Sequence, residues 1–393
     1  MTFTDAKLKE LRSDTPSCEE LLHFNNAGAS LMPDPVYDAV TGHLAKEREM
    51  GGYEAAADAH ESLERFYTSL ATLLRVQPNE IAYVENATRA WDMAFYAYPF
   101  QKGDRIVTHA SEYVSNYLAF MHMAKHKGVE IDIAPSDGHG QIDLDALPQL
   151  ITAQTKMLAI THVPTQGGLV NPAIEVGKVA KEHGLIYLLD ACQSVGQLDV
   201  DASTIGCHIL SGTGRKFLRG PRGTGFLYVS QELVDELDPP FIDLRAATWT
   251  TESTYELAPG AKRFENWESY IAGRVGLAAA VDYALSIGMP VIEERVTKLG
   301  SMLRERLSAI DSVTTHDLGE KKCGIVTFSK NGVDPGDLEN QLVQKGINIS
   351  VTFKTSAQLD LGRRKLSNIA RASVHYFNTE DEIDRFCNAI MEA

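Results

Sequence analysis

Between about residues 80 and 230, short apolar runs alternate with amphipathic stretches of helical period. The seven apolar runs are Ile81–Val84, Arg105–Thr108, Val129–Ala134, Met157–Thr161, Leu185–Leu189, His208–Leu210 and Gly225–Val229. Tyr113–Lys125 and Pro172–His183 between them have helical period, and Gly184 is suited to end the second helix. Short strands separated by helices are typical of a mainly parallel sheet covered on both faces. We therefore predict an α/β fold around a mainly parallel seven-stranded sheet.

The pattern changes after about residue 260, past a polar loop expected around Thr248–Lys262. The following elements are predicted as helices at Trp267–Ile287 and Pro290–Ile310, a strand at Gly324–Phe328, a helix opened by Asp334-Pro335, a strand at Ile347–Val351 and a last helix near Glu380–Met391. We predict a large α/β domain over residues 15–260. A smaller α+β domain should contain residues 1–14 and 261–393.

Composition excludes several classes of function. The 393 residues include 37 Lys and Arg against 53 Asp and Glu, a net charge of -16, and no basic run suggests nucleic-acid binding. The charged N-terminus and the lack of a long apolar span predict a cytoplasmic protein without membrane association. Five scattered cysteines without a CxxC pair support neither a disulfide framework nor a metal site.

Two polar residues follow apolar runs at the edge of the sheet where ligands bind in such folds. Asp190 ends one run, and by itself it could simply cap the next turn. Lys216 follows another run, and a lone lysine there could be a solvated loop residue. Together they supply an amine that can form a Schiff base and a carboxylate that can keep a pyridine nitrogen protonated. The pair therefore predicts a site for pyridoxal 5'-phosphate, with Lys216 as the catalytic residue.

Two motifs carry a resemblance to a known family. Asp-Ala-Cys-Gln-Ser-Val-Gly at 190–196 is followed by Ser-Gly-Thr-Gly-Arg-Lys-Phe-Leu-Arg-Gly-Pro-Arg-Gly-Thr-Gly at 211–225. This combination resembles the class V aminotransferase superfamily, which includes cysteine desulfurases, isopenicillin N epimerase-like proteins and carbon–sulfur lyases. The likeness extends from Asn25 to Ser373. It implies the type I fold of pyridoxal-phosphate enzymes and a homodimer with active sites at the subunit interface.

The resemblance assigns the phosphate of the cofactor to a helix start and to the turn before Lys216. Thr88 and the amide of Ala87 lie at a predicted helix N-terminus, which suits an anion, although Thr88 could also serve as an ordinary helix cap. Thr213 matches a phosphate-binding hydroxyl. Arg215 stands where the family has a histidine, and it keeps a cation near the phosphate.

Three further residues are matched to the cofactor ring. Tyr113 occupies the position of a histidine that stacks on the pyridine, and a phenol offers the same flat face, although a buried helix-start tyrosine is an equal alternative. Gln193 matches the residue that hydrogen-bonds the phenolic oxygen. Thr165 falls where desulfurases carry an asparagine near the same oxygen.

The resemblance also assigns a substrate site. Arg371, expected just before a buried strand, matches the arginine that binds the substrate α-carboxylate, for which a surface salt bridge is the alternative. Asn25, Ala27 and Gly28 lie in a segment near the substrate mouth, as does Gly51–Tyr53, although both could be turns. We expect the substrate side chain to be recognised by Asn25–Ser30, Gly51–Ala55, Phe353–Ser356 and the partner subunit.

The same cofactor supports several reactions on amino acids, and fold does not choose among them. A desulfurase needs a cysteine nucleophile shortly before Arg371, and Ser350–Ser356 contains none. We therefore predict a carbon–sulfur β-lyase acting on a cysteine conjugate or its sulfoxide. Lys216 would remove the α-proton, and pyruvate and ammonia would result. The alternatives are an aminotransferase, an epimerase, a cysteine desulfurase and a non-catalytic binding module.

Overall fold

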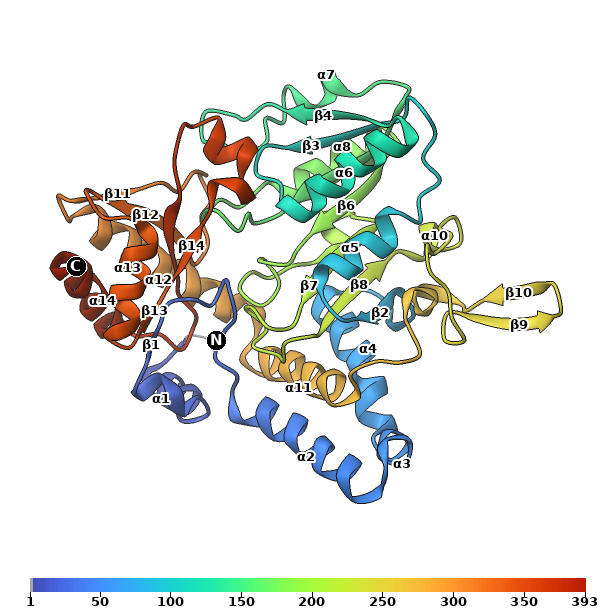
Figure 1. The fold of residues 1–393 in the computed structure, drawn as a ribbon, viewed down its shortest axis with the longest axis horizontal. Helices are drawn as coiled ribbons and strands as arrows, with labels where there is room; N and C mark the ends of the chain where they lie inside the picture. The colour runs from blue at the N-terminus through green and yellow to red at the C-terminus, as the bar shows by residue number, and fades with distance from the viewer. Residues whose placement is uncertain (1–2) are drawn as a thin grey trace.

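The computed structural model describes residues 3–393 and is built around a seven-stranded sheet (Figure 1). In spatial order the strands are β2 (Ile81–Val84), β8 (Gly225–Val229), β7 (Ile209–Thr213), β6 (Ile186–Asp190), β5 (Thr155–Thr161), β3 (Arg105–His109) and β4 (Glu130–Ala134). Six of the strands run in the same direction, and β8 runs in the opposite direction between β2 and β7. The predicted α/β fold with a mainly parallel seven-stranded sheet is therefore confirmed.

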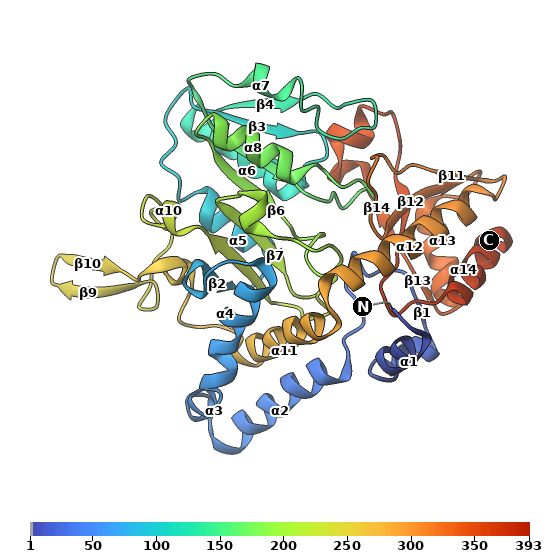
Figure 2. The same ribbon diagram turned by 180° about the vertical axis from the view of Figure 1, so that it is seen from behind.

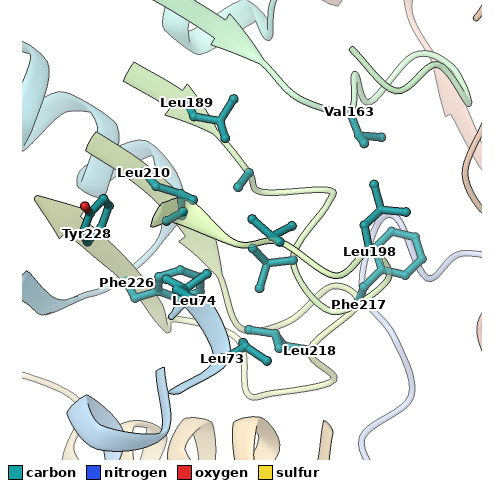
Figure 3. Packing of buried hydrophobic residues seen from close by; sticks show 14 of the residues in the cluster. Leu73, Leu74, Val163, Leu189, Leu198, Leu210, Phe217, Leu218, Phe226 and Tyr228 are labelled. Carbon is teal, nitrogen blue, oxygen red and sulfur yellow. The ribbon is translucent and has the colours of Figure 1, made fainter. Parts of the chain in front are cut away.

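Helices cover both faces of this sheet. The helices are α4 (His60–Leu74), α8 (Ala173–Glu182) and α11 (Ile271–Ile287) on one face, and α5 (Ala87–Phe95) and α6 (Val114–Lys127) on the other. Strand residues alternate between two cores, as a pleated strand requires: Leu189 faces the first core and Leu188 the second. Figure 3 shows Leu210 and Phe226 of the sheet packed near Leu74 of α4 in the first core.

A smaller, four-stranded antiparallel sheet forms a second layer with its own helices. Its strands are, in order, β11 (Val313–Thr315), β12 (Ile325–Lys330), β15 (Ile369–Ser373) and β14 (Ser350–Thr352). The helices around it are α12 (Met289–Ser308), α13 (Pro335–Gln344) and α14 (Glu380–Glu392), with α1 (Asp5–Ser13) nearby (Figure 2). Further short helical elements are η1 (Pro16–Glu19), α3 (Gly52–Asp58), η2 (Pro78–Glu80), α7 (Leu147–Leu150), α9 (Ala202–Ile205), α10 (Gln231–Val234), η3 (Gly260–Phe264), η4 (Lys354–Ser356) and η5 (Gln358–Gly362).

Two contacts cross the predicted domain boundaries. Helix α11 packs on α4 and α2 (Asp34–Met50), and its Leu277 and Val281 lie in the first core of the large sheet. Strand β1 (Leu22–His23) pairs in parallel with β13 (Ile347–Asn348). The division at residues 15 and 260 stays a prediction. We propose to place α11 with the large domain, because it packs on helices of that domain, and β1 with the small domain, because it pairs with β13.

Several predicted elements differ from the structure. The expected loop at Thr248–Lys262 contains a hairpin of β9 (Ala247–Thr251) and β10 (Thr254–Leu257), which projects beyond the body of the molecule (Figure 1). Its threonine and aromatic residues favour strands, but both faces are exposed, so the apolar alternation that marks a buried strand is missing. The single strand predicted at Ile347–Val351 is two strands, β13 and β14, which belong to different sheets.

In the part of the chain that the structure describes, no single helix is long and apolar enough to cross a membrane. Only the pair α11 and α12 meets that length and composition jointly, and a bend of 81° separates the two helices. Most of the apolar residues of both helices are buried inside the protein.

Candidate active site

A cavity of about 170 Å³ lies where β5, β6 and β7 end and α5 begins. Because the carboxyl ends of parallel strands share one edge of the sheet, the residues after several strands meet there. The lining residues are Asn86, Ala87, Thr88, Tyr113, Asn116, Thr161, Val163, Thr165, Asp190, Cys192, Gln193, Arg215 and Lys216. The structure thus brings together every residue predicted to bind the cofactor except Thr213.

Lys216 is almost completely buried in the turn that follows β7. Its Nζ lies 3.4 Å from Sγ of Cys192. Burial lowers the pKa of the Lys216 ammonium, with the nearby Arg215 acting in the same direction and Cys192 opposing it. A lowered pKa increases the fraction of neutral amine, which is the form that can react with a carbonyl carbon or accept a proton.

Asp190 is the last residue of β6, and its carboxylate is held by two hydrogen bonds. The side chain of Asn116 donates to Oδ2 at 2.8 Å, and the amide of Cys192 donates to Oδ1 at 2.8 Å. Burial raises the pKa of Asp190, while these bonds and Lys216 oppose the shift. A cation such as a protonated pyridine nitrogen would stabilise this buried carboxylate in its charged form.

Sequence reasoning missed the network that supports Asp190. Nδ2 of Asn116 also donates to Glu112 at 2.9 Å, and Glu112 accepts further bonds from the hydroxyls of Thr108 and Thr161. Burial raises the pKa of Glu112 to about 7, and the neighbouring Asp190 adds to the shift. The signal in the sequence was the closeness of Glu112, just before α6, to Asn116 in the first turn of that helix.

The phosphate end of the cavity is the N-terminus of α5. Oδ1 of Asn86 caps the helix by accepting from the amide of Arg89 at 2.9 Å, and the first amides of a helix have no partner within it. The amides of Ala87 and Thr88 therefore remain available to an anion. Gly225 on β8 allows the close approach, because a Cβ there would lie 2.7 Å from the carbonyl carbon of Asn86.

The two residues predicted beside Lys216 are placed differently. Arg215 lines the cavity, as expected for a cation near a phosphate. Thr213 is buried outside the lining, where its hydroxyl donates to the carbonyl of Thr224 at 3.2 Å and accepts from Arg215 at 3.2 Å. Thr213 therefore orients the guanidinium of Arg215, and a direct contact to phosphate stays a prediction.

Thr165 joins the residues predicted for the cofactor oxygen to those predicted for the substrate. Its hydroxyl accepts from Nε2 of Gln193 at 3.1 Å and from Nη1 of Arg371 at 2.6 Å. Nε2 of Gln193 also donates to the carbonyl of Ala27 at 3.1 Å, whereas its Oε1 has no partner. Nη2 of Arg371 lies 3.5 Å from Oδ1 of Asn25.

Arg371 lies inside β15, not before a strand as the sequence suggested. It is 7% exposed, and none of the ion pairs within residues 3–393 includes it. Nε has no hydrogen-bond partner. Burial lowers the pKa of Arg371 to about 10, and Arg215 contributes to the shift. A buried guanidinium without a carboxylate partner is suited to bind an anion such as a substrate carboxylate.

Of the other predicted site residues, Tyr113 lines the cavity, and Gly28 and Tyr53 do not. Tyr113 precedes α6 and lines the cavity, with its amide hydrogen-bonded to Glu112 at 2.8 Å. Gly28 follows the Asn25 segment, and a Cβ on it would overlap Oδ1 of Asn25 at 2.4 Å. Tyr53 is 75% exposed on α3 and does not line the cavity, so the prediction that Gly51–Tyr53 lies at the mouth is not met within this chain.

These residues fit pyridoxal 5'-phosphate at each of its functional groups. A buried lysine amine and a buried carboxylate face the same cavity, and a helix N-terminus with Arg215 beside it suits the phosphate. The unpartnered Oε1 of Gln193 is the kind of buried polar atom that a bound group would satisfy.

Comparison with known proteins agrees with this geometry. The family model for aminotransferase class V matches residues 22–386. A probable cysteine desulfurase of Pyrococcus abyssi is 29% identical over 98% of this chain and 97% of its own length. The apo structure of a cysteine desulfurase from Thermococcus onnurineus superimposes with a TM-score of 0.92 at 27% identity, covering 100% of this chain and 99% of that chain.

A more distant solved structure shares the fold. The cystine C-S lyase C-DES, solved with its product cysteine persulfide, superimposes with a TM-score of 0.87 at 21% identity and covers 96% of this chain and 99% of its own. The same fold is thus found among proteins described as desulfurases and as a lyase, so fold does not select the reaction. The match of the family model over nearly the whole chain, together with the buried lysine and carboxylate, shows that this chain belongs to the class V aminotransferases and uses pyridoxal 5'-phosphate.

Proposed function

We propose that this enzyme is a carbon–sulfur β-lyase acting on a cysteine conjugate or its sulfoxide. The observation that carries the proposal is the chemistry around Lys216 and Arg371. Lys216 is a buried base that lines the cavity, Arg371 is a buried cation without an ion-pair partner that hydrogen-bonds Thr165 in the cavity wall, and Ser350–Ser356 before Arg371 contains no cysteine. When bound, the cofactor would supply an electron sink that makes the α-proton of an amino acid acidic.

The residues of the chain have distinct roles in this proposal. Arg371 would bind the α-carboxylate, with Thr165 holding its guanidinium in place. Asp190 would keep the pyridine nitrogen protonated, and Gln193 would orient the ring through its phenolic oxygen. Lys216 would accept the proton from Cα, and its lowered pKa favours the neutral amine that this step needs.

The reaction balances without a further reactant besides water. The α-proton moves to Lys216, the bond between Cβ and sulfur breaks, and the electron pair leaves with sulfur as a thiolate, or as a sulfenate from a sulfoxide. Addition of water to the remaining three-carbon fragment gives pyruvate and ammonia. Each conjugate consumed should therefore yield one thiol or sulfenic acid, one pyruvate and one ammonia.

A second candidate is cysteine desulfurase, which the description of the relatives favours. That reaction needs a protein thiol to accept sulfur. Among the described residues, Cys18, Cys207, Cys323 and Cys387 are buried, and Cys192 is the cysteine that lines the cavity. Burial raises the pKa of the Cys192 thiol, which reduces the fraction of nucleophilic thiolate. We therefore place the lyase first.

The test measures products from the purified holoenzyme with L-cysteine and a panel of S-alkyl cysteines and their sulfoxides. We expect pyruvate and ammonia, with turnover falling by about 10³-fold or more in Lys216→Ala. Lys178→Ala, which removes an exposed lysine on α8, should leave turnover unchanged. Alanine and a protein persulfide on Cys192 would establish the desulfurase, and conversion to the pyridoxamine form with an oxo-acid product would establish an aminotransferase.

We also propose that the enzyme is a homodimer, as the family resemblance implies. Large exposed apolar side chains gather on α2, on α3, on the loop before β9 and on the hairpin. They are Tyr37, Leu44, Met50, Tyr53, Phe241, Ile242, Leu244, Trp249 and Tyr255. Exposed aromatic side chains such as Tyr53, Trp249 and Tyr255 are enriched in protein–protein contacts.

A further inference from the structure

A second cavity of about 220 Å³ lies beside the cofactor pocket on the same edge of the sheet. Its walls are the segments that follow β3, β4 and β5, together with residues of the small domain around η5. The two cavities share walls: Pro164 and Gln166 line this one, and Thr165 between them lines the cofactor pocket. Likewise Ser111 lines this cavity and Tyr113 lines the other.

The distance between the two cavities is short on the scale of a substrate. The cofactor pocket lies at the ends of β5, β6 and β7 and is centred near β6, and the second cavity lies at the ends of β5, β3 and β4 and is centred near β3. Neighbouring strands are about 4.8 Å apart, so two strand spacings separate the sites by roughly 10 Å. An amino acid whose sulfur carries a chain of a few atoms could therefore reach from the first cavity into the second.

The amide of Gln166 points to a ligand in this cavity. Gln166 is 1% exposed, and neither its Nε2 nor its Oε1 has a hydrogen-bond partner of normal geometry. Buried amides without partners are rare in folded proteins because they lose hydrogen bonds to water without replacement. The amide nitrogen carries two hydrogens, of which the nearby carboxylate of Asp360 can accept one, so the second hydrogen and the acceptor Oε1 remain open in a wall of the cavity.

The charges around the cavity favour an anion. Arg363 lines it, is exposed, and forms no ion pair or side-chain hydrogen bond in the described part of the chain. Arg364 is already paired with Asp360 at 3.1 Å and donates to the carbonyl of His316 at 2.6 Å. Asp360 faces the amide of Gln166, but its charge is offset by Arg364. One unpaired positive charge therefore remains, on Arg363.

The histidine in the wall does not add a second charge. The two ring nitrogens of His109 lie 2.8 Å and 2.9 Å from the hydroxyls of Ser111 and Ser136. Burial lowers the pKa of His109 to about 4. The negative charge of Asp137 opposes this shift and the positive charge of Arg363 adds to it, so the ring is neutral at pH 7. The cation available to a ligand is therefore Arg363.

We propose that this second cavity binds a carboxylate on the leaving half of the substrate, with Arg363 as its cation and Gln166 as its hydrogen-bond partner. The inference rests on the proposed lyase function and narrows its substrate to conjugates whose thiol half carries a carboxylate a few atoms from sulfur. Arg371 would hold the α-carboxylate at one end and Arg363 the second carboxylate at the other. Neither Gln166 nor Arg363 was predicted from the sequence as a recognition residue.

The test compares two probes that differ only in their end group, S-(2-carboxyethyl)-L-cysteine and S-propyl-L-cysteine. Binding to the holoenzyme is measured by calorimetry, and pyruvate is measured separately. We expect the wild-type enzyme to bind the carboxyethyl probe about tenfold more tightly, a preference that Arg363→Gln removes while binding of the propyl probe is unchanged. Gln166→Leu should also weaken binding of the carboxyethyl probe alone.

Lys365→Gln is the matched control, because it removes an exposed positive charge two residues away without altering the wall of the cavity. It should keep the preference for the carboxyethyl probe. Equal binding of both probes by wild type, or an unchanged preference in Arg363→Gln, overturns the inference. If the preference is found but no pyruvate forms, the cavity assignment stands and the lyase proposal fails. If both probes yield pyruvate equally in wild type and Arg363→Gln, the lyase stands and this assignment fails.

Discussion

Asp190 and Glu112 are two buried carboxyl groups that share one donor, the side-chain amide of Asn116. Two negative charges this close are costly in a low-dielectric interior, so one carboxyl should be neutral unless a cation compensates it. Asp190 faces the cavity, where a protonated pyridine ring would compensate its charge. Glu112 faces away into a set of hydroxyl and amide groups, and its pKa of about 7 makes it the protonated member of the pair below neutral pH.

This assignment predicts a pH-dependent difference in stability between the wild-type enzyme and Glu112→Gln. The folded pKa is raised above the unfolded value, so the folded state binds the proton more tightly, and that stabilisation is lost as pH rises from about 4.5 to about 7. Glu112→Gln has no carboxyl group to titrate at this position and therefore does not lose this stabilisation. We expect its stability relative to wild type to increase over that window by up to about 1.4 kcal/mol per pH unit.

The measurement is the thermal midpoint of both proteins at a series of pH values from 4.5 to 8. Glu294→Gln, an exposed site on α12, is the matched control and should parallel the wild-type curve throughout. Parallel curves for Glu112→Gln and wild type would show that Glu112 does not titrate in this range in the folded protein.

At the scale of elements, the N-terminus of α5 is the feature that prepares the cavity for phosphate. Asn86 has extended backbone angles, with φ -172° and ψ 168°, and caps the helix, so the amides of the first turn point into the cavity mouth. Extended angles at this residue are also those that a following proline requires. Proline is tolerated as the first residue of a helix, because the amide hydrogen there has no helical partner.

Ala87→Pro should therefore retain α5 but remove one hydrogen-bond donor to the cofactor phosphate. We expect the affinity for pyridoxal 5'-phosphate to fall by about tenfold, as for the loss of one hydrogen bond to a charged group. The affinity is measured by adding the cofactor back to cofactor-free protein and following its absorbance. Ala87→Ser keeps the amide and should bind as wild type does. Unchanged affinity in Ala87→Pro would place the phosphate elsewhere.

At the scale of the whole molecule, the hairpin of β9 and β10 bears on whether two chains associate. Trp249 is 78% exposed and Tyr255 52% exposed, on strands that form a two-stranded sheet of their own (Figure 1). An isolated two-stranded hairpin is marginally stable in water, so a partner that covers these aromatics would stabilise it. The proposed homodimer provides such a partner.

The dimer proposal predicts a mass in solution of twice the chain mass of 43.2 kDa. Replacing Trp249 and Tyr255 together by serine should shift the equilibrium toward monomer, because the contact loses its largest apolar side chains. Light scattering coupled to gel filtration over a range of concentrations measures the shift. Val343→Ser with Met391→Ser, which removes exposed apolar side chains from the small domain, should leave the mass unchanged. A monomeric wild-type enzyme would contradict the proposal.

The sequence by itself determined the layered α/β fold and the cofactor. Burial requires apolar runs, so the seven strands were visible as local patterns, and Asp190 and Lys216 could be found because each directly follows such a run. The strands of the exposed hairpin were missed, because exposure on both faces leaves no apolar alternation, and β13 and β14 were predicted as one strand, because two or three residues are too few to show a break between them.

Only the tertiary structure decided which distant residues complete the site. Arg371 meets Thr165 across 206 residues of sequence and Asn25 across 346, and no local pattern encodes such a meeting. The role of Asn116 on α6 depends on Asp190, which ends β6 and lies 74 residues away. Gln166 and Arg363 come together only because the small domain closes over the edge of the large sheet. Local sequence specifies burial and chemistry, whereas proximity depends on the path of the whole chain.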